Sequence, residues 1–145
     1  MINIISGAVV FDDNLSIDAT TQLSGIASIS SAKVVHSVPE RTQLSLGSHE
    51  IQGHVWGVGV IFVQTKLNQI WLQLLNADGV DAIAWSLENE KIRKFSHDSF
   101  VKKLCSSSGD VNQSISSLVY KFSWGKISSV LDIRGVQALI VFEYL

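Results

Sequence analysis

Cysteine is almost absent from this sequence, in which Cys105 is the only one among 145 residues. A lone cysteine excludes a disulfide within the chain, so nothing in the sequence requires an oxidising compartment. Proline is equally scarce, and Pro39 alone cannot form a proline-rich linker between domains. A domain of this length can bury roughly 68–70% of the surface of its unfolded chain, so it needs no disulfide to be stable. We therefore predict a single domain over residues 1–145.

Charged residues are also few. They make up 17% of the chain, against about 25% in an average soluble domain, and the formal net charge is -2. Binding to nucleic acid through its phosphates needs a clustered basic surface, so the composition argues against a nucleic-acid partner. No apolar run approaches the ~20 residues of a membrane span. The first residues lack the cationic segment of a signal peptide, so we predict a cytoplasmic protein without membrane association.

What the sequence does contain is a strong β pattern in its middle. His54–Val63 is a β-rich run, Gln64-Thr65-Lys66 suits a hairpin turn, and residues 67–75 return with apolar and polar side chains alternating. Gly57 and Gly59 lie on one face of the first run, where a helix or an aromatic side chain could approach closely. This order of strand, turn and strand predicts an antiparallel meander.

The last quarter of the chain reads as two strands joined by a tight turn at residues 132–135. Tyr120, Phe122 and Trp124 project from one face of the first strand at period two, so we expect Trp124 to belong to the core. The second strand, residues 136–144, is apolar on both faces, which predicts that both of its faces are covered.

The remaining segments are assigned from their turn residues and short apolar patterns. We expect a first strand over residues 2–11 closed by a turn at 12–14, a short strand over 32–38, a half-exposed strand over 41–46 followed by a turn at 47–49, and a polar loop over 110–117.

Residues 87–106 have the composition of a helix. Ser86 suits the N-cap, Glu88 and Glu90 lie early, and two lysines lie late, as the helix macrodipole favours. Gly109 fits a C-terminal stop. The apolar residues do not keep a single phase, so a continuous helix and a kinked one both remain open. The elements together predict an α+β fold, an antiparallel β-sheet meander of about six or seven strands with one main helix packed on one face.

No group of side chains has the spacing of a catalytic or metal site. The histidines and the single cysteine do not match the spacing of zinc ligands. Cys105 and His97 are the one conceivable thiol–imidazole pair, but on a helix they project about 80° apart. No neighbouring residue orients the imidazole, as nucleophilic catalysis requires. We therefore predict no catalytic residue, no metal and no cofactor.

Charged residues at two places are candidates for contact with a partner. Glu88 and Glu90 form an acidic pair at the start of the helix, where negative charges also interact favourably with the helix macrodipole. Asp132 and Arg134 lie in the last turn, which they also shape. A protein partner of complementary charge would be steered by such residues.

One combination of features resembles a known family. A meander is followed by a charged helix with Glu90 and His97, by Tyr-x-Phe-x-Trp-Gly at 120–125, by Asp-x-Arg-Gly at 132–135 and by a terminal strand. This order is similar to that of small bacterial α+β immunity proteins of polymorphic and contact-dependent toxin systems. The resemblance extends from the meander to the C-terminus and transfers no functional residue. It implies a non-enzymatic protein that neutralises a toxin by direct binding, with a basic nuclease-type toxin as one kind of partner.

Two other classes of function remain open on the sequence. A small enzyme or ligand-binding domain would use a cavity between the helix and the sheet. A structural subunit would bury its apolar excess in a homodimer or a larger homo-oligomer, consistent with the low fraction of charged residues.

Overall fold

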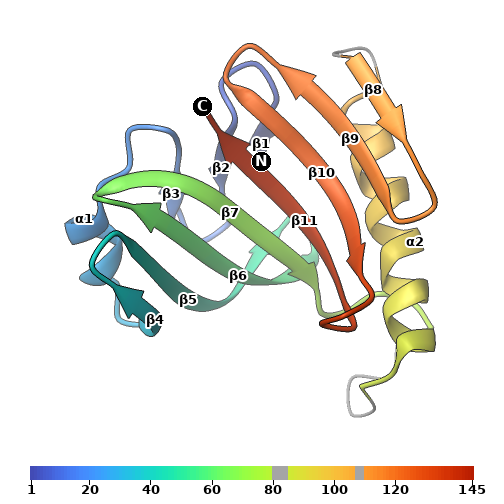
Figure 1. Ribbon diagram of the computed structural model, residues 1–145, viewed down its shortest axis with the longest axis horizontal. Helices are drawn as coiled ribbons and strands as arrows, with labels where there is room; N and C mark the ends of the chain where they lie inside the picture. Colours follow the sequence, from blue (N-terminus) through green and yellow to red (C-terminus); the bar gives the residue numbers. More distant parts are fainter. Residues whose placement is uncertain (80–84, 107–109) are drawn as a thin grey trace.

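An eight-stranded antiparallel sheet forms the centre of the protein, as the computed structural model of the chain shows (Figure 1). The structure describes residues 1–79, 85–106 and 110–145. The strands lie side by side in the order β4-β5-β6-β7-β11-β10-β9-β8. Their bounds are β4 Lys33–Val38, β5 Arg41–Ile51, β6 His54–Val63, β7 Lys66–Leu74, β8 Asp110–Gln113, β9 Ser117–Phe122, β10 Gly125–Asp132 and β11 Gln137–Tyr144.

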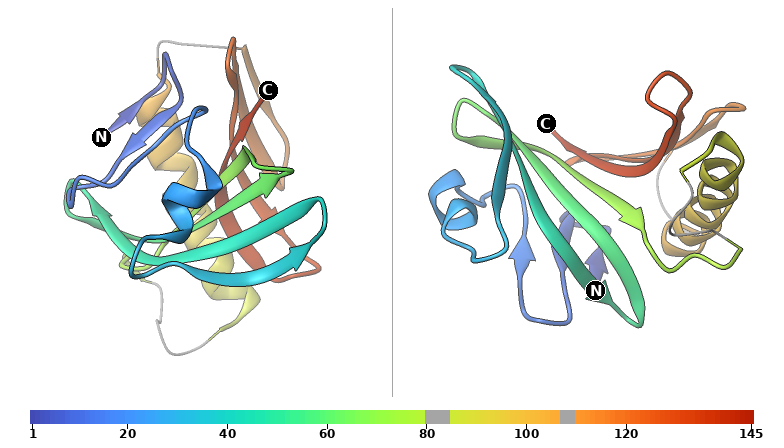
Figure 2. Two further views of the ribbon diagram at one scale, coloured as in Figure 1. Left: turned by 90° about the vertical axis from the view of Figure 1, so that its left-hand side faces the viewer. Right: turned by 90° about the horizontal axis from the view of Figure 1, so that it is seen from below.

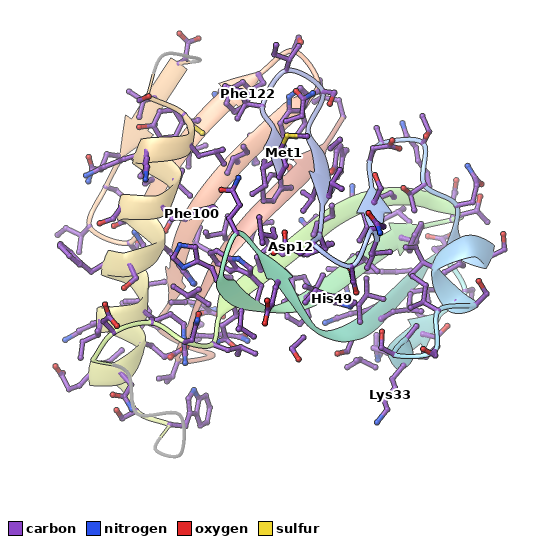
Figure 3. All side chains as sticks on the ribbon, turned by 180° about the vertical axis from the view of Figure 1, so that it is seen from behind. Met1, Asp12, Lys33, His49, Phe100 and Phe122 are labelled. Atoms are coloured by element: carbon purple, nitrogen blue, oxygen red, sulfur yellow. The ribbon has the colours of Figure 1, made fainter. Side chains whose placement is uncertain are left out.

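The other elements cover one face of this sheet. They are a three-stranded antiparallel sheet, a short helix and the main helix, with bounds β1 Ile2–Asn3, β2 Ala8–Val10, β3 Ser16–Ile17, α1 Leu23–Ala27 and α2 Leu87–Leu104. Seen from behind in Figure 3, all of them lie in front of the large sheet. The predicted α+β class, with an antiparallel sheet and a helix on one face, is confirmed, although the large sheet has eight strands rather than six or seven.

Strand register divides the side chains of the sheet between a covered face and an open face. One row on the covered face crosses five strands as Val60, Ile70, Phe142, Ile127 and Tyr120. These side chains join the hydrophobic core together with residues of the small sheet and α1. Figure 2 shows how strongly the large sheet curves around that core.

The adjacent row lies on the open face and passes through Gly59, Trp71, Val141, Ser128 and Val119. Val141 is half-buried although no element of the described chain covers it. The prediction that both faces of the last strand are covered is therefore wrong. The indole ring of Trp71 occupies the space above Gly59, where an added Cβ would lie 2.0 Å from the ring. The close approach of an aromatic side chain at this glycine is thus confirmed.

Several strand boundaries differ from the prediction. The predicted first strand is a hairpin of β1 and β2, with Gly7 at positive φ between them. The predicted turn at 47–49 is a bulge within the long strand β5, and Asp110–Gln113 pairs with β9 as an edge strand rather than forming a loop. The run through Trp124 contains an additional two-residue turn, because Phe122 pairs with Gly125.

Trp124 packs on the N-terminal hairpin from that additional turn. Its indole N–H donates to the carbonyl oxygen of Ile4 at 2.8 Å, and an added Cβ at Gly7 would lie 2.7 Å from the ring. Trp124 also stacks on Phe122 with ring centroids 5.4 Å apart. It is partly buried and packs against the core. The tryptophan therefore attaches the small sheet to the large one.

The main helix is continuous, which decides between the two versions left open by the sequence. The hydroxyl of Ser86 accepts a hydrogen bond from the backbone N–H of Asn89 at 3.2 Å, so the predicted N-cap is confirmed. The predicted stop at Gly109 lies outside the described residues. Neither helix in the described ranges combines the length and apolar character needed to cross a membrane.

Candidate functional site

The face of α2 that packs on the sheet carries charged side chains. Glu90, Arg93, Lys94 and His97 are all buried, and Glu90 and His97 have no exposed surface. Arg93 forms an ion pair with Glu90, and Lys94 forms one with Asp98. The buried charges therefore balance each other, as burial in a medium of low polarity requires.

These side chains lie where two strands of the sheet separate. The pairing between β7 and β11 ends at Leu72 and Ile140, so Leu74 and Ala138 do not pair. The carboxylate of Glu90 accepts a hydrogen bond from the backbone N–H of Ala138 at 3.1 Å. We call the three residues Glu90, Arg93 and His97 the helix wedge, because they contact backbone groups at the point of separation.

The other two side chains of the helix wedge form hydrogen bonds with the backbone of Leu74. The guanidinium of Arg93 donates from Nε to the carbonyl oxygen of Leu74 at 2.9 Å. The Nε2 atom of His97 accepts a hydrogen bond from the N–H of the same residue at 3.0 Å. Buried backbone groups left without partners are costly. The helix wedge therefore replaces the missing ladder between β7 and β11.

His97 is neutral in this environment. Burial, followed by the nearby charges of Arg93 and Lys94, lowers the pKa of its ring from 6.5 to about 3. Since Nε2 accepts a hydrogen bond, the proton of the neutral ring is on Nδ1. The ring also stacks on Trp56 with centroids 5.9 Å apart. A general base needs a pKa near the working pH, so these properties describe a structural histidine.

We expect the protein to lose stability in mild acid because of His97. The folded pKa of about 3 lies below the ordinary value of 6.5, so the contribution is fully present above about pH 6.5 and is lost as pH falls toward 3. The full loss is roughly 5 kcal/mol, of which about half falls between pH 7 and 4.5. Urea unfolding between pH 7 and 4.5 measures the change in the free energy of unfolding. The pKa values of Asp13 and Asp18 are lowered from 3.8, so these two carboxyls affect stability mainly below this pH range.

A His97→Gln variant is the control for this pH dependence. Without the titrating ring, its free energy of unfolding should change little between pH 7 and 4.5. An equal slope in the variant and the original protein would show that other groups cause the acid sensitivity.

The thiol–imidazole pair considered from the sequence does not form. Cys105 is buried, and its burial raises the pKa of the thiol to about 11. A thiol of this kind is not a nucleophile at neutral pH. His97 directs its accepting nitrogen to the backbone of Leu74 instead.

A second histidine is held between two acceptors. In His49, Nδ1 lies 2.8 Å from a carboxylate oxygen of Asp13, and Nε2 lies 2.8 Å from the carbonyl oxygen of Leu46. The hydrogen bond from His49 lowers the pKa of the Asp13 carboxyl. With both nitrogens engaged, this Asp–His pair has none free to take a proton from a substrate, and it connects the β2–β3 turn to β5.

The structure separates the two glutamates that the sequence grouped together. Glu88 is exposed and lies 3.4 Å from Lys91, whereas Glu90 is fully buried in the helix wedge. The expectation of one exposed acidic cluster is therefore wrong. Two positions along a helix correspond to about 200° of rotation, so the side chains point to opposite sides.

Three of the four predicted contact residues do share one end of the molecule. Asp132 and Arg134 are exposed in the turn between β10 and β11, where a carboxylate oxygen of Asp132 accepts the backbone N–H of Arg134 at 3.0 Å. That turn lies beside the start of α2 in Figure 1. The indole N–H of Trp85 joins them by donating to the carbonyl oxygen of Val136 at 2.8 Å.

Two exposed apolar residues at this end were not predicted as contact residues from the sequence. Trp85 is 73% exposed and Ile133 is 63% exposed. The signal for Trp85 was its place directly before the N-cap Ser86, outside any apolar pattern. We call Trp85, Glu88, Asp132, Ile133 and Arg134 the end surface.

No family model, no curated protein and no solved structure matches this chain. In the described part of the chain, no three histidine, cysteine or acidic side chains gather in a way that could hold a metal ion.

Proposed function

We propose that the protein is a non-enzymatic protein-binding module, and that it acts in the bacterial cytoplasm as an immunity protein that neutralises a toxin by direct contact. The observation that carries the proposal is the end surface. An exposed tryptophan there donates its indole N–H to the carbonyl oxygen of Val136, and the same end surface carries an exposed isoleucine and charges of both signs. Tryptophan and arginine are the residues most enriched at the energetic centres of interfaces.

Two further observations support binding rather than catalysis. The buried histidine and the cysteine have pKa values far from neutrality, in directions that hold the imidazole uncharged and the thiol protonated. The helix wedge uses its polar atoms to satisfy the backbone of the sheet. A rigid scaffold of this kind presents an interface with little cost in conformational entropy.

The test is binding to the toxin encoded beside the gene of this protein. We expect a stable complex, and we expect Trp85→Ala to weaken it at least about 30-fold, as for an interface hot spot. Phe95→Ala is the matched control, because Phe95 is an equally exposed aromatic residue, also 73%, elsewhere on the helix. Affinity is measured by calorimetry, and thermal unfolding confirms that each variant is folded.

Charge at the end surface gives a second readout in the same assay. If the toxin is basic, Glu88→Lys should slow association, since a charge at the rim of an interface acts mainly on the association rate. A complex that survives Trp85→Ala and Glu88→Lys unchanged would remove the end surface from the proposal. The absence of binding to the neighbouring toxin would contradict the immunity function itself.

A further inference from the structure

Two adjoining cavities lie along the C-terminal half of α2, away from the end surface. Their volumes are about 480 Å³ and about 320 Å³. His54, Phe100 and Lys103 line both, so the cavities form one groove between α2 and the turn that joins β5 to β6. Phe100 is labelled on α2 in Figure 3. We call this feature the α2 groove.

The smaller cavity has an apolar wall held by the core. It is lined by Ile2, Ile51, Phe100 and Leu104, of which Ile51 is only 2% exposed. The ring of Phe100 contacts the buried Trp56 edge-on with centroids 4.9 Å apart. A wall backed in this way is preformed, which is typical of sites for small molecules.

The charge at the smaller cavity has one sign. Lys103 lines this cavity and has no ion-pair partner among the described residues. No described carboxylate lines the cavity. The ring of His54 stands edge-on to Phe100, with centroids 6.1 Å apart, at the junction of the two cavities. The one carboxylate that lines the groove within the described ranges is Asp78, in the larger cavity.

We propose that the α2 groove binds a small amphipathic anion, a free molecule with an aromatic or branched apolar body and a single acidic group. The body packs in the smaller cavity against Phe100 and Leu104, and the acidic group lies at the junction near Lys103 and His54. A half-open cavity of about 320 Å³ with an apolar wall and one lysine at its rim fits the size of such sites. This site is separate from the end surface and does not depend on the immunity function.

Two naphthalene dyes that differ in one charge provide the test. The probe is 8-anilinonaphthalene-1-sulfonate, and its neutral counterpart is N-phenyl-1-naphthylamine, which lacks the sulfonate. We expect saturable binding of the sulfonate at one site per folded chain, with weaker binding of the neutral dye. Lys103→Met should weaken binding of the sulfonate about tenfold and leave the neutral dye unchanged, as loss of one charge-assisted contact predicts.

Lys102→Met is the matched control. Lys102 is also exposed in the last turn of α2 but does not line the groove, so its removal should leave both dyes unaffected. Leu104→Glu, which places a charge in the apolar wall, should weaken both dyes. Equal affinity for the two dyes, or equal effects of Lys102→Met and Lys103→Met, would overturn the proposal. Amide chemical shifts measured during the titration verify that the protein stays folded.

Discussion

Glu90→Ala is expected to destabilise the protein by about 3–5 kcal/mol, enough to leave it largely unfolded. Removing one member of a buried ion pair leaves the other charge buried without compensation, and costs of this size follow. Here Arg93 would lose its carboxylate while remaining 8% exposed, and the N–H of Ala138 would lose its acceptor. Urea unfolding measures the loss.

Glu88→Ala is the control for this result. It removes the same side chain two positions earlier, from an exposed site whose contact with Lys91 is also exposed. Its effect should stay within about 0.5 kcal/mol. A Glu90→Gln variant, which can still accept from Ala138 but has no charge, should fall between the two. If Glu90→Ala proved as stable as Glu88→Ala, the helix wedge would not support the sheet as described.

Gly125→Ala is expected to cost roughly 3 kcal/mol or more, through a collision with the backbone. Gly125 begins β10, and an added Cβ would lie 1.9 Å from the carbonyl oxygen of Glu143 on β11. A backbone atom in a paired strand cannot move aside as the end of a flexible side chain can. The hairpin would have to separate at this point, and chemical denaturation should report the loss.

Gly25→Ala is the matched substitution at an open site. Gly25 lies within α1, and nothing stands within 4 Å of its added Cβ. Alanine favours a helix over glycine, so this variant should be more stable by about 0.5–1 kcal/mol. Similar effects of the two substitutions would indicate that crowding at Gly125 does not constrain the fold.

The sequence predicted most strands of the large sheet, including the exposed strand β4, but missed the edge strand β8. β6 and β7 alternate between core and open face, and their hairpin was found. Asp110–Gln113 is exposed along its whole length at the edge of the sheet, so it has no alternation to detect. Trp124 continues the alternation of aromatic residues in β9, so nothing in the sequence indicated that Trp124 lies in the turn after that strand.

The phase of α2 could not be obtained from apolar residues because its buried face is largely polar. Its buried residues are Glu90, Arg93, Lys94, His97 and Val101, whereas Phe95 is 73% exposed. The pattern that identifies a core-facing helix therefore points to the wrong side here. The backbone partners of Glu90, Arg93 and His97 lie on β7 and β11, which the sequence of the helix alone does not reveal.

The end surface was only partly predictable for a related reason. Asp132 and Arg134 were found from turn chemistry, but their proximity to the start of α2 depends on packing between segments far apart in the chain. The contact between Trp85 and Val136 establishes that proximity, and it has no local signature.

The separation of β7 from β11 has a consequence for the kinetics of folding. Leu72 pairs with Ile140, so the whole of α2 lies in the connection between the two strands. Arg93 and His97 find their partner on the neighbouring strand β7, but Glu90 has no bond to Ala138 until the distant strand β11 arrives, and closing so long a loop is slow. We therefore expect α2 to become stable late, in the same step that joins the two halves of the sheet, rather than acting as an early nucleus.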